Sequence, residues 1–179
     1  MPNVAELRVK LFADGANLKD IERLAANPLI KGFTTNPTLM RKAGIADYEV
    51  FARKLLAAVP DRPVSLEVFA DDFDVMERQA MMIASWGKNV NVKIPVTNTK
   101  REFAGPLIRK LSAAGVAVNV TAVFTLDQVR CITDCLAQDT PAIVSIFAGR
   151  IADTGVDPVP IMAEAVKILK AKPRSELIW

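Results

Sequence analysis

Short apolar runs alternate with longer amphipathic segments along the whole chain. The short runs are rich in valine and isoleucine and are bounded by turn residues, which predicts β-strands buried on both faces. The longer segments repeat apolar residues every three or four positions, which predicts helices. We predict strands at 8–14, 32–36, 64–69, 89–96, 117–124, 142–148 and 176–179, and helices at 18–26, 48–59, 72–86, 99–114, 126–136 and 158–171.

Local signals support several of these helix ends. Asn17 and Thr125 directly precede predicted helices and are residue types that cap helix N-termini. Pro106 should kink the helix at 99–114, and Gly115 should end it.

The predicted order is a repeating strand–helix unit of about 25–30 residues, which is typical of the βαβ module. Such repeats form either a doubly wound open sheet or a (β/α)8 barrel. No glycine-rich fingerprint follows the first strand, and polar residues near the strand ends favour the barrel, whose active sites gather at that edge. We therefore predict a single α/β domain over 1–179, a (β/α)8 TIM-type barrel.

The length conflicts with a complete barrel, which typically has about 250 residues. The chain stops at the start of a seventh strand, so we expect the closing elements to be missing. Either the sequence is truncated or another chain covers the exposed strand edges.

The composition bears on the possible partners and on the cellular location. Hydrophobic residues make up 51% and charged residues 24%, the net charge is +3, and no basic stripe with aromatic residues is present, which argues against nucleic acid as a partner. No apolar run approaches the length of about 20 residues that spans a membrane, and no signal-peptide core is evident. Cys131 and Cys135 lie four apart in a predicted helix and are expected to pack as small apolar side chains, which indicates a reducing, cytoplasmic location.

The chain has no histidine. This excludes serine–histidine and cysteine–histidine nucleophiles, and it argues against a zinc-dependent aldolase. If the protein acts on carbonyl compounds, an amine rather than a metal must activate the electrophile.

Lys93 is the candidate amine, because it lies alone in the valine- and isoleucine-rich run NVNVKIPV. A buried ammonium is costly, so this lysine is paired, partly solvated or held as a neutral amine that can form a Schiff base. The alternative is a structural salt bridge at the end of the sheet.

Polar residues of three predicted strands share side-chain parity within each strand, as an occupied polar barrel interior would require. The pairs are Ser65 and Glu67, Asn91 and Lys93, and Asn119 and Thr121.

The remaining polar residues can be assigned by chemical type. Asp14 and Glu67 are the carboxylates for proton transfer, and Thr121 could hold a water molecule between Glu67 and the lysine. Asn36 and Asn119 are suited to orienting substrate hydroxyls.

Ser145 and Arg150 are suited to a phosphate. Simpler interpretations stay open: Asp14 as a turn residue, Ser145 as a small strand filler, and Arg150 in a surface ion pair with Asp153 or Asp157.

Six motifs together resemble the transaldolase family, and the similarity runs collinearly from Val9 to the end of the chain. They are FADGAN (12–17), GFTTNPTLM (32–40), SLEV (65–68), NVKIP (91–95), NVTAVFT (119–125) and SIFAGRIAD (145–153). The resemblance implies a circularly shifted (β/α)8 barrel that moves a dihydroxyacetone unit between sugar phosphates of the pentose phosphate pathway. It also implies that no cofactor or metal is needed and that the protein is a homo-oligomer, a pentamer or a ring of ten.

Carried over by motif, Lys93 would be the Schiff-base lysine and Asp14 the acid/base for carbon–carbon cleavage. Glu67 and Thr121 would handle the catalytic water. The resemblance further implies substrate contacts from Asn36 and Asn119 to the bound intermediate, and from Ser145 and Arg150 to the phosphate.

The similar fructose-6-phosphate aldolases release free dihydroxyacetone and carry glutamine and tyrosine where this chain has Glu67 and Phe147. By this comparison we also expect Phe147 to be a substrate-binding residue. Because phenylalanine cannot help to protonate the enamine, we predict a transferase acting on fructose 6-phosphate or sedoheptulose 7-phosphate, with glyceraldehyde 3-phosphate or erythrose 4-phosphate as acceptor. The alternatives are an aldolase and an inactive barrel fragment.

Overall fold

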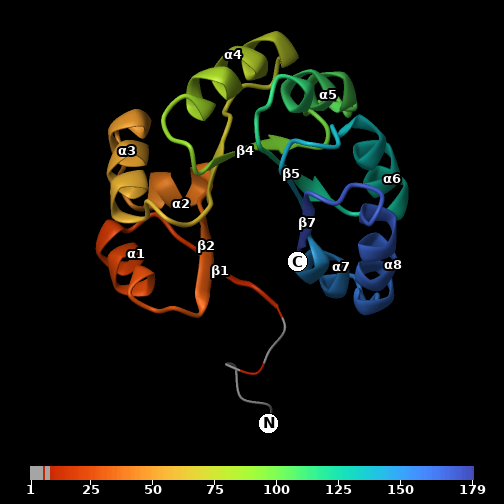
Figure 1. Ribbon diagram of the computed structural model, residues 1–179, viewed down its shortest axis with the longest axis horizontal. Helices are drawn as coiled ribbons and strands as arrows, with labels where there is room; N and C mark the ends of the chain where they lie inside the picture. Colours follow the sequence, from red (N-terminus) through yellow and green to blue (C-terminus); the bar gives the residue numbers. More distant parts are fainter. Residues whose placement is uncertain (1–5, 7–8) are drawn as a thin grey trace. The chain divides into compact units, whose positions relative to one another are not determined.

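The computed structural model describes residue 6 and residues 9–179, which divide into two compact units. Unit 1 contains the described residues up to Glu67 together with Ser85–Val90, and unit 2 contains Val68–Ala84 and Asn91–Trp179. Strands and helices alternate along the chain in both units (Figure 1).

Unit 1 is a parallel sheet of three strands with helices between them. Its strands pair in chain order, β1 with β2 and β2 with β3. The elements are β1 (Leu11–Asp14), α1 (Leu18–Ala25), β2 (Ile30–Thr34), α2 (Pro37–Lys42), α3 (Tyr48–Ala58) and β3 (Val64–Glu67). Of the predicted strand at 8–14, residue 8 lies outside the described residues, and the strand begins at Leu11.

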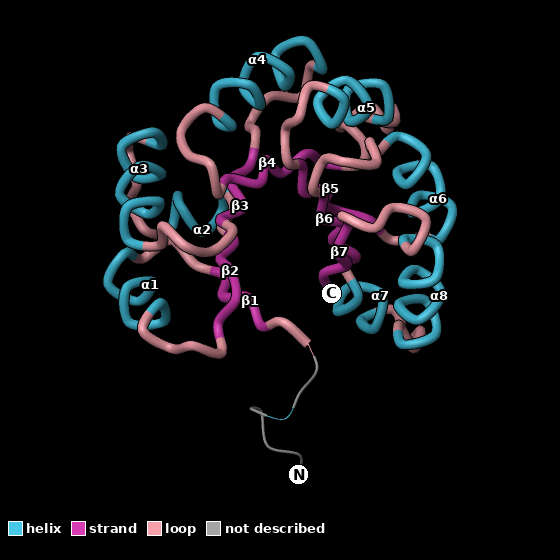
Figure 2. The backbone as a smooth tube through the Cα atoms, viewed as in Figure 1, coloured by secondary structure: helices cyan, strands magenta, loops and turns pink. Residues whose placement is uncertain are grey.

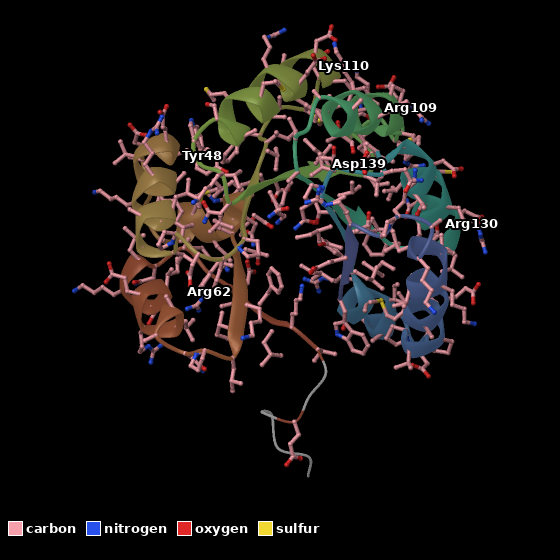
Figure 3. The ribbon with its side chains drawn as sticks, in the orientation of Figure 1. Tyr48, Arg62, Arg109, Lys110, Arg130 and Asp139 are labelled. Carbon is pink, nitrogen blue, oxygen red and sulfur yellow. The ribbon has the colours of Figure 1, made fainter. Side chains whose placement is uncertain are left out.

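Helices α1 and α3 pack against each other and lie on the same side of these strands (Figure 2). Phe33, Leu55 and Leu66 are almost completely buried in this layer. Arg62, labelled in Figure 3, donates hydrogen bonds to the carbonyl oxygens of Ala25, Asn27 and Ile30 at 2.7, 3.3 and 3.0 Å. The guanidinium therefore satisfies carbonyl groups at the end of α1 and the start of β2.

Unit 2 continues the same alternation. Strand β4 pairs with β5, β5 with β6, and β6 with β7, all parallel. The elements are α4 (Phe73–Ala84), β4 (Val90–Pro95), α5 (Gly105–Ala113), β5 (Val118–Val123), α6 (Leu126–Cys135), β6 (Ala142–Ile146), α7 (Ala148–Asp153), α8 (Val159–Leu169) and β7 (Ser175–Ile178). Residue 90 of β4 belongs to unit 1, and the rest of this strand belongs to unit 2.

Parallel strands that pair in chain order, with helices between them, are the arrangement of the (β/α)8 TIM-type barrel. Both units have it, which confirms the predicted α/β class, and the described residues supply seven of its strands. Among these residues, no helix combines the length and apolar character that crossing a membrane requires.

The predicted helix caps are confirmed. The Asn17 side chain accepts hydrogen bonds from the backbone of Lys19 and Asp20. Thr125 forms a reciprocal capping box with Gln128 at the start of α6. Gly115 follows α5 with a φ of +81°, a left-handed conformation that glycine adopts without steric cost.

Several predicted boundaries are wrong, and three of them have a local physical reason. The helix expected at 99–114 begins at Gly105, because Pro106 lies in its first turn, where proline is tolerated, and so it starts the helix rather than kinking it. The strand expected at 32–36 is β2, and Asn36 lies outside it as the N-cap of α2. The strand expected at 142–148 ends at Ile146, since Ala148 already begins α7.

The expected packing of both cysteines is also wrong in part. Cys135 is buried beside Ile132 on the core side of α6, but Cys131 is exposed, and both are free thiols. Burial raises the pKa of the Cys135 thiol. Residues 129, 132, 133 and 135 form the buried stripe of α6, and position 131 falls on the other side of the helix.

Candidate active site

Asp14 lies exposed at the carboxyl end of β1 in unit 1. The Thr34 hydroxyl donates to its Oδ1 at 2.7 Å, and Asn36 Nδ2 lies 3.5 Å from its Oδ2. Thr34 is paired in register with Asp14 on the neighbouring strand. The partners of this carboxylate are therefore two other side chains, which distinguishes it from an aspartate that only stabilises a turn.

Asn36 is held by the helix that it caps. Its Oδ1 accepts the backbone N–H of Leu39 at 3.0 Å at the start of α2, where Pro37 occupies the first turn. Because the oxygen is used for the cap, the amide nitrogen is the side that faces Asp14. The cap thus fixes the orientation of a side chain that sequence analysis assigned to substrate.

Glu67 ends β3 and is half-buried. Its carbonyl oxygen accepts a hydrogen bond at 3.1 Å from the hydroxyl of Tyr48, which Figure 3 labels. The Tyr48 ring meets the Trp86 ring edge-on, with centroids 5.3 Å apart. Burial raises the pKa of Tyr48 well above its ordinary value, and the nearby Glu67 charge raises it further, although the hydrogen bond acts in the opposite direction. This neutral phenol fixes the end of β3.

Lys93 lies in the middle of β4 in unit 2 and is only 9% exposed. It pairs in register with Asn119 on β5, and Val92 and Ile94 on either side of it are fully buried. Its backbone carbonyl accepts the N–H of Val68 at 3.2 Å. The amine is therefore carried by a strand that is bonded along its length.

Asn119 and Ser145 form a buried polar pair next to this lysine. The Ser145 hydroxyl donates to Asn119 Oδ1 at 2.7 Å, with the two residues 9% and 1% exposed, respectively. Ser145 is thus more than a small filler of β6. Thr121, also buried, pairs with Pro95, two residues beyond the Lys93–Asn119 pair in the same register.

Strand β5 contains a bulge directly after Thr121. Val120 pairs with Val144 of β6, but the next pair is Val123 with Ile146, so β5 carries one extra residue there. Ala122 has a φ of +59°, an uncommon backbone conformation for a residue with a Cβ atom.

Two phenylalanines lie beside the bulge: Phe124 follows β5, and Phe147 follows β6. The rings of Phe124 and Phe147 meet edge to face, with centroids 5.6 Å apart at an interplanar angle of 67°. They are 41% and 39% exposed, so the pair lies at the surface of unit 2.

Arg150 lies on α7 and is exposed. Its guanidinium forms an ion pair with Asp153 at 3.1 Å, one turn along the same helix. This is the surface ion pair that the sequence left open. Such an exposed pair contributes little to stability, so the guanidinium can exchange it for another anion.

Two loops of unit 2 are tied together beyond the candidate residues. The Asp71 carboxylate, in the loop after β3, accepts the Thr99 backbone N–H at 2.8 Å and the Thr99 hydroxyl at 2.7 Å. These hydrogen bonds, first the backbone and then the hydroxyl, lower the pKa of Asp71. Thr99 belongs to the loop that follows the strand of Lys93.

The predicted site residues are divided between the units. In unit 1, Asp14 and Asn36 come together, whereas Glu67 contacts Tyr48. In unit 2, Lys93, Asn119 and Ser145 form one buried polar group, and Phe147 and Arg150 lie at the surface. Among the described residues, no three acidic or cysteine side chains gather closely enough to hold a metal ion.

Sequence reasoning missed Thr34, Tyr48 and Phe124. Thr34 directly follows Phe33 in a quoted motif, and its position beside Asp14 would have been found by aligning the first two strands in register. Phe124 gave no such signal, because alanine at position 122 does not mark a left-handed residue.

Comparison with known proteins identifies a family whose members this chain resembles. Residues 11–178 match the model of the family described as transaldolase/fructose-6-phosphate aldolase. A protein from Dehalococcoides mccartyi named probable transaldolase is 38% identical over 162 residues, covering 90% of this chain and 71% of that protein. A probable transaldolase 2 from Listeria monocytogenes is 35% identical over 161 residues, covering 90% and 69%.

Among solved structures, the carboxyl transferase domain of Rhizobium etli pyruvate carboxylase matches with a TM-score of 0.55 at 11% identity. The match covers 98% of this chain but 40% of that one. At this identity the similarity concerns the fold alone.

Proposed function

Because the chain belongs to the transaldolase/fructose-6-phosphate aldolase family, we propose that it is a transaldolase that transfers a dihydroxyacetone unit through a Schiff base on Lys93. The observation that carries the proposal is the buried amine of Lys93 on β4, paired in register with Asn119. A lysine amine can act as a nucleophile that forms a Schiff base with a carbonyl substrate.

In the proposed reaction, the amine of Lys93 attacks the ketose carbonyl, and loss of water gives an iminium. Asp14 removes the proton from the hydroxyl group whose carbon–carbon bond breaks, and the electron pair moves onto the iminium to form an enamine. The aldose leaves. The enamine then attacks the acceptor aldehyde, Asp14 returns the proton, and water releases the new ketose and the free lysine.

The other candidate residues have supporting roles in this proposal. Asn36 and Asn119 orient hydroxyls of the bound three-carbon unit, and Glu67 with Thr121 guides the water used to form and hydrolyse the iminium. Ser145 and Arg150 bind the substrate phosphate, for which the guanidinium leaves its exposed partner Asp153.

The proposal also covers the substrates, the cellular location and the assembly state. The donors are fructose 6-phosphate or sedoheptulose 7-phosphate, and the acceptors are glyceraldehyde 3-phosphate or erythrose 4-phosphate, as in the pentose phosphate pathway. The free thiols of Cys131 and Cys135 are consistent with a reducing cytoplasm. We also propose a homo-oligomer, which light scattering tests.

Borohydride trapping with fructose 6-phosphate tests the mechanism. We expect a reduced dihydroxyacetone adduct on Lys93, located by peptide mass spectrometry, and no adduct in the Lys93→Met variant. A folded wild-type protein that gives no adduct would refute the proposal.

Acceptor dependence separates the transferase from an aldolase. Phe147 has no hydroxyl to protonate the enamine, which favours the transferase. We expect product only when an acceptor aldehyde is present, and steady release of free dihydroxyacetone without acceptor would identify the chain as an aldolase.

A further inference from the structure

We propose that Phe124 is a positioning residue, brought beside Phe147 by the bulge at Ala122, and that it holds the Phe147 ring where it keeps water from the enamine. This rests on the proposed function. Neither the residue type of Phe124 nor its place in the strand pattern indicates this role.

The register of β5 carries the first step. Counting on from the pair Val120 and Val144, a regular strand would place Phe147 opposite Val123 and would leave Phe124 one residue further on. The extra residue shifts the pairing by one, so that Val123 pairs with Ile146 and Phe124 comes level with Phe147. The Phe147 N–H donates to the Val123 carbonyl at 2.9 Å, which fixes this shifted alignment.

The bulge also changes the face to which Phe124 belongs. In a regular strand, Phe124 would share parity with Val120, on the face opposite to Asn119 and Thr121. One inserted residue reverses the parity beyond it. Phe124 therefore returns to the face of Thr121, where its ring meets that of Phe147.

The backbone of Phe124 is held independently of its ring. Gln128 Oε1 accepts the N–H groups of Phe124 and Thr125 at 2.8 and 3.1 Å, as part of the capping box of α6. Replacing the Phe124 ring should therefore leave the backbone in place and remove the edge-to-face contact alone.

The strained residue at the centre of the bulge is consistent with a functional site. Left-handed backbone at a residue other than glycine is costly and persists where the surroundings impose it. Thr121 directly precedes Ala122, and the Thr121 carbonyl oxygen accepts the N–H of Val96, the residue just after β4, at 2.9 Å. The bulge thus changes the alignment with β6 while the alignment with β4, the strand of Lys93, is kept.

The chemical consequence concerns the fate of the enamine. If a water molecule delivers a proton to its carbon, an iminium forms, and addition of a second water releases dihydroxyacetone and the free amine. If an acceptor aldehyde arrives first, the carbon–carbon bond forms instead. A fixed aromatic ring without a hydroxyl favours the second course by excluding water and supplying no proton.

The test compares Phe124→Ala with Phe124→Tyr, which keeps the ring edge, and with Met81→Ala, a control on α4 with a similarly exposed apolar side chain. The share of turnovers that end in free dihydroxyacetone is measured at fixed acceptor concentration. We expect Phe124→Ala to raise the ratio of release to transfer by about two- to twelvefold, the range corresponding to loss of one aromatic pair. Phe124→Tyr keeps the edge-to-face contact and should raise the ratio less than Phe124→Ala does, and Met81→Ala should leave the ratio unchanged.

A second pair of variants addresses the bulge. Ala122→Gly suits the left-handed backbone and should keep the ratio, whereas Ala122→Val is disfavoured there and should raise it. Circular dichroism checks that each variant is folded.

A spectroscopic measurement keeps the inference independent of turnover. The chain has 8 phenylalanines, so labelling with 4-fluorophenylalanine gives a small set of fluorine resonances, and the Phe147→Leu variant identifies one of them. Phe124→Ala should shift the Phe147 resonance, and Met81→Ala should not.

The outcomes separate the two proposals. An unmoved Phe147 resonance, or an unchanged ratio in an active Phe124→Ala variant, would overturn the role of Phe124 and leave the transaldolase proposal intact. Absence of a borohydride adduct in the wild type would refute the transaldolase proposal, and with it this role of Phe124, whatever the fluorine spectrum shows.

Discussion

Asp14 in unit 1 and Lys93 in unit 2 both lie on parallel strands, yet their surroundings differ. Asp14 is exposed and is held by the side chains of Thr34 and Asn36. Lys93 is buried between fully buried neighbours and pairs with Asn119, which is itself bonded to Ser145. We therefore expect substitutions at the Asp14 site to lower activity without changing stability. Substitutions around Lys93 should change both activity and stability.

The largest effect is expected for Lys93→Met. Loss of the amine should lower the transfer rate at least about a thousandfold. The melting temperature should change as well, because the substitution alters a side chain that is buried between fully buried neighbours. Steady-state kinetics and a thermal melt check both results.

Lys110→Met is the matched control, since this lysine is exposed on α5 in an ion pair with Glu77. This variant should change neither the transfer rate nor the melting temperature appreciably. A Lys93→Met protein with an unchanged melting temperature would contradict the difference between the two surroundings.

Asp14→Asn should have the next largest effect, a loss of about 10²–10⁴ in transfer rate, as for removal of a general acid/base. Because Asp14 is exposed, the melting temperature should not change. Thr34→Val removes the hydroxyl that donates to Asp14 and should cost less, about tenfold. Equal losses in the two variants would indicate that the hydroxyl itself acts on substrate.

Ser145→Ala should alter both properties, as the comparison requires of unit 2. The variant removes the donor to the buried Asn119 Oδ1 and should lower the free energy of unfolding by about 1–3 kcal/mol. If Ser145 also binds the phosphate, the KM for fructose 6-phosphate should rise. Urea unfolding and initial rates test this, and unchanged stability would contradict the buried pair.

The smallest effect is expected for Tyr48→Phe, which loses one hydrogen bond to the Glu67 carbonyl and should cost about 1 kcal/mol of stability. The raised pKa of Tyr48 adds a pH dependence. Above the ordinary tyrosine pKa of 10.0 the unfolded chain loses this proton while the folded chain keeps it, so stability should fall as pH rises.

Tyr48 is the one tyrosine of the chain, so tyrosinate absorbance reports on it alone. If Tyr48 ionised at the ordinary tyrosine pKa of 10.0, this result would contradict its burial. In Tyr48→Phe, the part of the alkaline loss of stability that comes from this group should disappear.

The strand order could be predicted from the sequence because buried parallel strands leave uninterrupted runs of valine and isoleucine, such as those around Lys93 and Asn119. Asn17 and Thr125 were recognisable because capping depends on side chains next to a helix start. The start of α5 was not, since proline is compatible with both a kink and a first turn, and tertiary context decides.

The candidate site was predictable where chemistry depends on residue type, as with Lys93 and Asp14. It was not predictable where geometry depends on the backbone. The bulge at Ala122 changes the face of every residue after it in the strand, and alternation read from the sequence assumes that no residue is inserted. Exposure of Cys131 similarly followed from the rotation of α6.

The bonds between Asp71 and Thr99 bear on how relatives of this chain can exchange parts. They join the segment after β3 to the segment after β4, so the two loops form one module although they are far apart in sequence. Transplanting either loop alone from a relative would leave a carboxylate or a threonine without its counterpart. Recombination that swaps both together should yield functional chimeras more often than recombination that swaps one.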